Sequence, residues 1–230
     1  MKNNSIAIIG GMGPQASAYM YKLLIDMAQK EFAALNNDDF PEIILYSLPV
    51  PDFISNKKNK QIALGMLKEC VKRFNNIDVS TLAIACNTAH VLLPELEKIS
   101  KQKFISMIDE VAKQVKQSKT ERIGILGTPS TINSRLYQIA LSKYKIESII
   151  PNKKQQTLLD KIIRNVLANK IQQVDLKQLI SIADSLRFKG ANGIVLGCTE
   201  LPLIFPSSYP ITVYSSTAIL SRALLRKYYE

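Results

Sequence analysis

Short apolar runs rich in β-branched residues alternate along this chain with longer stretches in which apolar residues recur every three or four positions. The short runs predict buried β-strands, and the longer stretches predict helices that each turn one apolar face toward a core. Strands that alternate with helices are typical of an α/β protein with parallel sheets. We therefore expect eight strands, over residues 6–9, 43–47, 81–85, 104–107, 123–126, 146–150, 194–196 and 211–214.

The predicted strands fall into two sets of four that resemble one another. Residues 6–11 (IAIIGG) and residues 123–128 (IGILGT) both run from a strand into a glycine turn. A later strand in each set leads into a cysteine, Cys86 in the first set and Cys198 in the second. This approximate repeat predicts two similar lobes. Because ligands of open α/β sheets bind beyond the carboxyl ends of the strands, we expect both cysteines to face a cleft between the lobes.

Composition and charge narrow the class of protein. Of the 230 residues, 47% are hydrophobic and 21% are charged, which is ordinary for a globular enzyme. No run approaches the roughly 20 apolar residues of a membrane helix, and the first residues do not resemble a signal peptide, so we expect a cytoplasmic protein without a membrane partner. The net charge of +11 is scattered over predicted helices. It therefore favours a small anionic substrate over a nucleic-acid partner.

Three cysteines and one histidine limit the chemistry. No Cys-x-x-Cys pair is present, so we expect reduced thiols and no metal site. Cys70 lies in the apolar stripe of a predicted helix and is expected in the core. His90 follows Cys86 by four residues, which leaves a Cys-His hydrolase open. We expect this histidine to lie along the first helical turn after Cys86 and to support packing.

Two thiols on opposite sides of a small cleft suit one class of reaction. Inversion of an amino-acid stereocentre requires removal of the α-proton from one face and delivery of a proton to the other face. A thiolate and a thiol can do both. The pKa of a free cysteine is about 8.5, and a nearby helix N-terminus lowers it, so that a thiolate can form. The alternative is that Cys86 and Cys198 are ordinary buried residues. Their positions at strand ends, their equivalence in the two sets and the threonine after each favour catalysis.

The two glycine turns are candidates for binding a carboxylate. The turn IIGGMGP at residues 8–14 lacks the complete G-x-G-x-x-G pattern of a dinucleotide site. Its glycines can let backbone N–H groups approach a carboxylate, and Thr128 and Thr131 offer hydroxyls in the equivalent turn of the second half. In both turns the alternative is a tight turn with an ordinary helix cap.

These segments together resemble the aspartate/glutamate racemases, which are amino-acid racemases that use no pyridoxal phosphate. The resemblance rests on GGMGP, on CNTAH around Cys86, on GTPST with Tyr137 shortly after it, and on GCTE around Cys198. It implies two pseudo-symmetric α/β lobes, each with a four-stranded, mainly parallel sheet flanked by helices, and an active site in the cleft between them. It also implies that the C-terminal helix returns to the first lobe. The family resemblance further implies a homodimer. We accordingly expect a first lobe over residues 1–106 and 212–230, and a second lobe over residues 107–211.

The resemblance assigns roles to particular residues. Cys86 and Cys198 would be the two catalytic bases, with neither a cofactor nor a metal. The substrate would be held by residues that flank the cysteines and the glycine turns: Met12, Gly13, Asn87, Thr88, Thr128, Thr131, Thr199 and Glu200. Glu200 resembles the aspartate branch of the family, because glutamate racemases usually carry His at this place. We therefore expect an acidic amino acid as substrate, aspartate before glutamate.

Several residues depart from the pattern of the family. Phe53 stands where many aspartate racemases have an arginine for the side-chain carboxylate, and Ser215 stands where the family commonly has Asp. Arg164 and Val166 stand where Tyr and Glu are frequent. Three basic residues are candidates to replace the missing cation: Lys57, Lys58 and Arg164. These departures concern the substrate rather than the fold.

Other functions remain open on the same residues. A hydantoin racemase, a maleate-type isomerase or a decarboxylase would use the same scaffold, although the presence of both cysteines argues against a one-cysteine decarboxylase. A non-catalytic amino-acid-binding protein would bind its ligand without exchanging the α-hydrogen, and Ser215 in place of a carboxylate keeps that interpretation open. A nucleic-acid role rests on charge alone and would show steeply salt-dependent binding.

Overall fold

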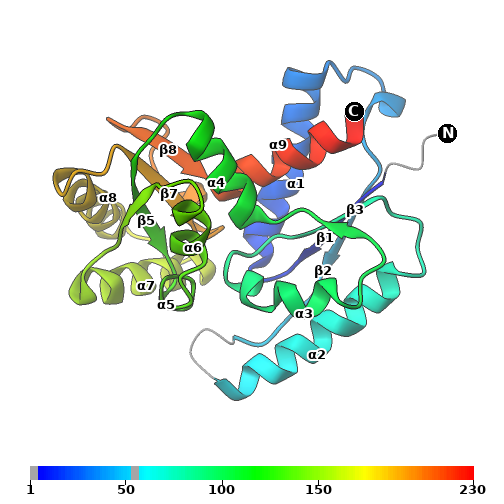
Figure 1. Cartoon of the computed structure of the whole chain (residues 1–230), viewed down its shortest axis with the longest axis horizontal. Helices are drawn as coiled ribbons and strands as arrows, with labels where there is room; N and C mark the ends of the chain where they lie inside the picture. The colour runs from blue at the N-terminus through cyan, green and yellow to red at the C-terminus, as the bar shows by residue number, and fades with distance from the viewer. Residues whose placement is uncertain (1–4, 53–56) are drawn as a thin grey trace. The chain divides into compact units, whose positions relative to one another are not determined.

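A computed structural model of the chain describes residues 5–52 and 57–230 (Figure 1). The chain divides into two compact units. Unit 1 comprises Met1–Met107 and Thr217–Glu230, and unit 2 comprises Ile108–Ser216. Unit 1 is thus assembled from two separate stretches of sequence, whereas unit 2 is continuous.

Helices connect successive strands throughout the described chain. The first half contains β1 (Ile6–Gly10), α1 (Pro14–Phe32), η1 (Asn37–Asp39), β2 (Ile43–Ser47), α2 (Lys57–Phe74), β3 (Thr81–Ile84), η2 (Thr88–Leu92), α3 (Leu93–Glu97), β4 (Lys103–Phe104) and α4 (Met107–Gln117). The second half contains β5 (Arg122–Gly127), α5 (Pro129–Asn133), α6 (Leu136–Ser142), β6 (Glu147–Ile149), α7 (Lys153–Leu167), α8 (Gln173–Phe188), β7 (Gly193–Gly197), η3 (Leu201–Leu203), β8 (Thr212–Ser215) and α9 (Ser216–Tyr229). Nowhere in residues 5–52 and 57–230 does a helix combine the length and the apolar character needed to cross a bilayer.

Each unit contains one four-stranded sheet, and the two sheets repeat one topology. The strand order is β2-β1-β3-β4 in unit 1 and β6-β5-β7-β8 in unit 2. Every neighbouring pair of strands is parallel. The predicted α/β fold with two four-stranded parallel sheets is therefore confirmed.

Two features of the sheets differ from the sequence prediction. The apolar run at residues 104–107 was expected to form one strand, but β4 ends at Phe104 and Met107 is the first residue of α4. Met107 is fully buried, and a buried residue at a helix start cannot be told from a strand residue by its hydrophobicity. The second difference is the boundary at residue 212. Since β8 pairs with β7, that strand belongs to unit 2, and unit 1 resumes only at Thr217.

The sheet of unit 1 is buried on both faces at its central strands, β1 and β3. Alternate residues of its strand β1 enter two separate apolar clusters: Ala7 and Ile9 pack in one cluster with α2 and α3, whereas Ile6 and Ile8 pack in the other with α1 and α9. Burial on both faces explains why these strands are continuous apolar runs rather than alternating sequences. The helix α9 contributes three buried leucines to the second cluster: Leu220, Leu224 and Leu225.

The helix α9 lies beside α1 (Figure 1), and polar and aromatic contacts attach it to the first stretch of unit 1. The guanidinium of Arg222 donates two hydrogen bonds to the carboxylate of Glu31 in α1, at 2.6 and 2.7 Å. The hydroxyl of Tyr229 donates to the carbonyl of Asp39 at 2.8 Å, and its ring stacks on Phe32. The hydrogen bonds from Arg222 hold the pKa of Glu31 below its usual value. The C-terminal helix is therefore an integral part of unit 1.

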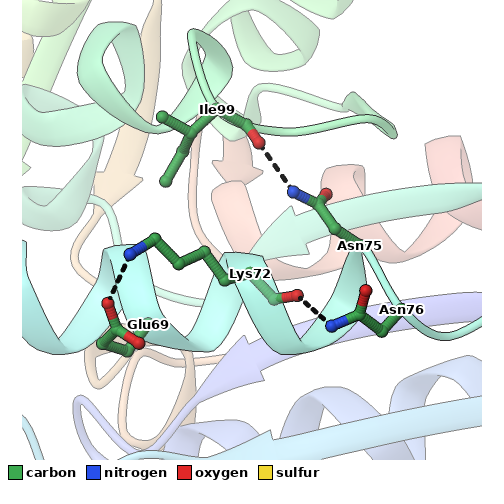
Figure 2. Close-up of polar contacts among 5 residues, drawn as sticks. All are labelled: Glu69, Lys72, Asn75, Asn76 and Ile99. Carbon is green, nitrogen blue, oxygen red and sulfur yellow. Dashed lines mark hydrogen bonds and ion pairs between the residues drawn. The ribbon is translucent and has the colours of Figure 1, made fainter.

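The end of α2 is attached to the segment between α3 and β4 (Figure 2). The side-chain amide of Asn75 donates to the carbonyl of Ile99 at 2.7 Å. The amide of Asn76 donates to the carbonyl of Lys72 at 3.3 Å and so satisfies one of the last carbonyls of the helix. The nearby ion pair of Lys72 with Glu69 is exposed and contributes little to stability. Asn75 therefore connects the end of α2 to the segment before β4, whereas Asn76 satisfies the end of its own helix.

Candidate active site

Cys86 lies two residues beyond the end of β3, the strand that pairs with β1. Its side chain is 9% exposed and joins the apolar cluster formed with α2 and α3. Asn87 and Thr88 follow directly and are buried as well. The cysteine and its two polar neighbours thus lie at the carboxyl edge of the sheet in unit 1.

The glycine turn after β1 lies at the same edge, because β1 and β3 are parallel neighbours. Met12 packs against the apolar cluster that contains Cys86. Gly11 has a φ of +90°, and a Cβ there would lie 2.5 Å from the backbone of Leu48. The hydroxyl of Ser17 accepts from the Gly11 N–H at 2.9 Å and donates to the Gly13 carbonyl at 3.0 Å. The turn is therefore held rigidly against α1, and the Gly11 N–H has Ser17 as its acceptor.

His90 uses both of its ring nitrogens within unit 1. Nδ1 lies 2.8 Å from the carbonyl oxygen of Cys86, and Nε2 accepts from the backbone N–H of Met107 at 3.0 Å. Because a carbonyl oxygen only accepts hydrogen bonds, the ring proton lies on Nδ1. The Met107 N–H belongs to the first turn of α4, where no helix carbonyl can accept it. His90 therefore connects the segment after β3 to the start of α4, in the packing role that the sequence predicts.

Cys198 immediately follows β7, the neighbour of β5 in the sheet of unit 2. Its Sγ donates to Oε2 of Glu200 at 2.9 Å. The hydroxyl of Thr199 donates to the same oxygen at 3.1 Å. All three side chains are buried. The predicted residues Cys198, Thr199 and Glu200 are thus in direct contact, and the contact of thiol with carboxylate is one that the sequence does not indicate.

Thr128 and Thr131 lie at the carboxyl end of β5, the neighbouring strand. The Thr128 hydroxyl accepts from the backbone N–H of Thr131 at 3.1 Å and lies 3.0 Å from its hydroxyl. Thr128 is therefore the N-cap of α5, which is the structural alternative considered for this turn. Substrate binding by the two threonines stays a prediction.

Tyr137 is a buried neighbour of Cys198, and the sequence alone does not indicate a role for it. Its side chain is fully buried, and a Cβ on Gly197 would lie 2.8 Å from its ring. Its hydroxyl is hydrogen-bonded to Ser216, which in turn donates to the carbonyl of Leu196 at 2.8 Å. Burial raises the pKa of Tyr137 well above its usual value, and the charge of a Cys198 thiolate raises this pKa further. Its position after GTPST was the one signal in the sequence.

Cys70 differs from the other two cysteines. It lies in α2 within the apolar core, and burial raises the pKa of its thiol to about 11. It therefore stays protonated at neutral pH, and the predicted core role is confirmed. None of the three cysteines, all of which the structure describes, forms a disulfide.

Comparison with known proteins identifies the family. The sequence model of the Asp/Glu/Hydantoin racemase family matches residues 9–224, which include both strand-end cysteines. The chain belongs to the Asp/Glu/hydantoin racemase family. It is 26% identical over 225 residues to the broad specificity amino-acid racemase RacX of Bacillus subtilis (strain 168), and the match covers 97% of each chain.

Solved structures share the fold of this racemase. The aspartate racemase of Picrophilus torridus superimposes with a TM-score of 0.86 and 28% identity, over 98% of this chain and 94% of that one. An aspartate racemase homologue from Pyrococcus horikoshii OT3 gives a TM-score of 0.83 and 26% identity, over 99% and 100% of the two chains. The predicted family resemblance is confirmed over nearly the whole length of the chain.

The residues of this racemase that depart from the pattern of the family differ in their surroundings. One of them, Phe53, lies outside the described residues, and so do the side chains of two candidates for the missing cation, Lys57 and Lys58. Arg164 lies on α7, where its Nε donates to Asp160 at 3.0 Å and 45% of its side chain is exposed. Val166 is a core residue of α7, and Ser215 is the last residue of β8. Of the candidates for the missing cation, Arg164 has a carboxylate of its own helix as partner.

A bound metal ion would need several side chains of the described residues to lie together as its ligands. Within residues 5–52 and 57–230, no group of three or more His, Cys, Asp or Glu side chains is gathered as ligands of an ion would be. Each unit presents a thiol, hydroxyls and amides at the carboxyl edge of its sheet, and unit 2 adds the carboxylate of Glu200. This set is suited to proton transfer and to binding an anion.

Proposed function

We propose that this racemase interconverts the enantiomers of an acidic amino acid, aspartate first and glutamate second, with Cys86 and Cys198 as its two acid/base groups and without a cofactor. One topological observation carries the proposal. Each cysteine follows the third strand in the order of its sheet, β3 in β2-β1-β3-β4 and β7 in β6-β5-β7-β8. A repeat that keeps a thiol at the same position in both halves supports a reaction that needs two equivalent groups.

The proposed reaction transfers protons only. One cysteine, as the thiolate, takes the α-proton and becomes a thiol, and the electron pair of the C–H bond is delocalised into the α-carboxylate. The other cysteine, as the thiol, donates its proton to the opposite face of the same carbon and becomes a thiolate. Atoms and total charge are unchanged, and the two cysteines exchange roles in the reverse direction.

Hydrogen-bond donors beside the two cysteines support binding of the α-carboxylate, whose negative charge grows during proton removal. The residues proposed for this role are Met12, Gly13, Asn87, Thr88, Thr128, Thr131 and Thr199. The net charge of +11 favours the approach of an anionic substrate. A solved aspartate racemase among the relatives supports aspartate as the first substrate to test.

The test is proton NMR of the protein with L-aspartate, and separately with L-glutamate, in deuterated buffer without added cofactor, followed by chiral chromatography. We expect the α-proton signal to disappear as the D-isomer forms. With two bases, the D-isomer made in early turnover carries deuterium at Cα, while the remaining L-isomer still carries protium. Deuterium in both isomers at equal rates would indicate one base. Binding without exchange of the α-hydrogen would replace the proposal with an amino-acid-binding protein.

Cysteine variants test the assignment of the two bases. Cys86→Ser and Cys198→Ser should each lower the racemisation rate by about 10²–10⁴-fold, the range for loss of a general acid or base. Cys70→Ser is the matched control, because it makes the same chemical change in the core of α2. It should retain activity while losing some stability. Full activity of either strand-end variant would contradict the two-base assignment.

A further inference from the structure

Glu200 is an acidic side chain in direct contact with Cys198. The thiol donates to Oε2 at 2.9 Å, the Thr199 hydroxyl donates to the same oxygen at 3.1 Å, and the Glu200 residue is only 4% exposed. An ionised carboxylate can only accept hydrogen bonds, so the proton between the two groups is the proton of the thiol. This geometry therefore favours the protonated form of Cys198, the thiol.

We propose that Glu200 keeps the proton on Cys198, so that the enzyme awaits its substrate with Cys198 as the thiol and Cys86 as the thiolate. The assignment rests on the two-thiol function proposed above. A glutamate carboxyl has a reference pKa of about 4.3 and a thiol one of about 8.5, so a proton shared between them lies on sulfur. The negative charge of the carboxylate also opposes a second negative charge on the neighbouring sulfur, and water screens this repulsion poorly because the pair is buried.

Tyr137 is a second titratable group near Cys198. Its ring contacts the backbone at Gly197, and its hydroxyl is hydrogen-bonded to Ser216. Burial keeps this phenol neutral, since its pKa is raised well above the usual value. A carboxylate and a neutral phenol therefore lie near the Cys198 thiol, and neither supplies a positive charge that would stabilise a thiolate. Tyr137 of α6 and Glu200 of the segment after β7 therefore both favour the thiol form of Cys198 over the thiolate.

This role makes Glu200 a positioning residue for a proton rather than a ligand of the substrate. After a turnover that starts from the resting form, Cys86 holds a proton and Cys198 is a thiolate beside the Glu200 carboxylate. Repulsion between the two negative groups favours return of one proton from water to Cys198 and loss of one proton from Cys86 to water. The resting form is then restored with no net change of protons.

Titration of each thiol alone tests the proposal. The variant Cys70→Ala/Cys86→Ala retains Cys198, and the variant Cys70→Ala/Cys198→Ala retains Cys86. Thiolate formation is followed against pH by ultraviolet absorbance, with and without Glu200→Gln. We expect Glu200→Gln to move the midpoint for Cys198 to lower pH by at least about one unit, a tenfold change in thiolate fraction, because a neutral amide replaces the carboxylate. The midpoint for Cys86 is the matched control and should not move.

An unchanged midpoint for Cys198, or an equal shift for Cys86, would overturn the proposal. If Glu200→Gln does not fold, as judged by circular dichroism, the wild-type enzyme decides the question. The rate at which iodoacetamide alkylates each cysteine is then measured against pH by peptide mapping. The midpoint of each rate profile is independent of how accessible the thiol is, and Cys86 must ionise at lower pH than Cys198. The reverse order would refute the assignment. Because these measurements need no turnover, inactivity toward both amino acids would refute the proposed function separately.

Discussion

Replacement of His90 by leucine removes two buried hydrogen bonds while keeping an apolar side chain in the same place. The ring connects the Cys86 carbonyl to the Met107 N–H, at 2.8 and 3.0 Å. Leucine can neither donate nor accept, and the site is buried, so water cannot readily replace the lost bonds. A buried polar group that loses its partner costs about 1–3 kcal/mol. The carbonyl and the N–H together give an expected loss of about 2–6 kcal/mol in the free energy of unfolding.

Urea unfolding followed by far-ultraviolet circular dichroism measures this loss, since the chain contains no tryptophan to report by fluorescence. His90→Gln is the matched control, because glutamine keeps one donor and one acceptor on its side chain. It should lose less than half as much stability as His90→Leu. A His90→Leu protein within about 0.5 kcal/mol of the wild type, the range of an ordinary surface substitution, would refute the reasoning.

Three further predictions concern the stability of the folded protein. Burial raises the pKa of the Cys70 thiol from its ordinary value of 9.0 to about 11 in the folded protein. Between these pH values the unfolded chain loses this proton and the folded chain keeps it, so the wild type should lose about 2–3 kcal/mol relative to Cys70→Ala as pH rises through that window. Urea unfolding at several pH values checks this, and parallel curves would contradict it. Gly11→Ala should lower the melting temperature sharply, because its φ is +90° and its Cβ would meet backbone. Gly65→Ala in α2 has nothing within 4 Å of the new methyl and should add about 0.5–1 kcal/mol by the same thermal measurement, so equal effects of the two substitutions would be inconsistent with the structure. A double-mutant cycle on Arg222 and Glu31 should give a coupling of about 1 kcal/mol or less at neutral pH, because the pair is partly exposed. Since the pKa of Glu31 is lowered in the folded protein, this coupling is present above the usual glutamate pKa and is lost as the pH falls through the folded value, so a coupling that persists in acid would contradict the ion pair.

The order of elements was predictable from the sequence because the central strands are buried on both faces. The run from Ile6 to Ile9 is continuously apolar for that reason, and glycine marks its end. The strand β4 was overestimated, because Met107 is buried in a helix start and has the same hydrophobic character as a strand residue. The unit boundary depends on which sheet β8 joins, and strand pairing is not encoded in local composition.

The candidate site was predictable to the level of strand ends and not to the level of contacts. Cys86 and Cys198 were expected at strand ends because each follows an apolar run. The hydrogen bond from Cys198 to Glu200 depends on side-chain conformation, which sequence patterns do not report. The ion pair of Arg164 with Asp160 could have been anticipated, because residues four apart on a helix face one another.

The attachment of α9 to unit 1 has a consequence for how the chain folds during synthesis. Residues 108–216 form a unit without help from later sequence, so unit 2 can fold as soon as it has left the ribosome. The cluster around Ile6 and Ile8 stays incomplete throughout that time, because the leucines of α9 that close it are made after the whole of unit 2. Newly made unit 1 therefore exposes apolar surface until α9 has been synthesised, and removal of α9 would leave that surface exposed.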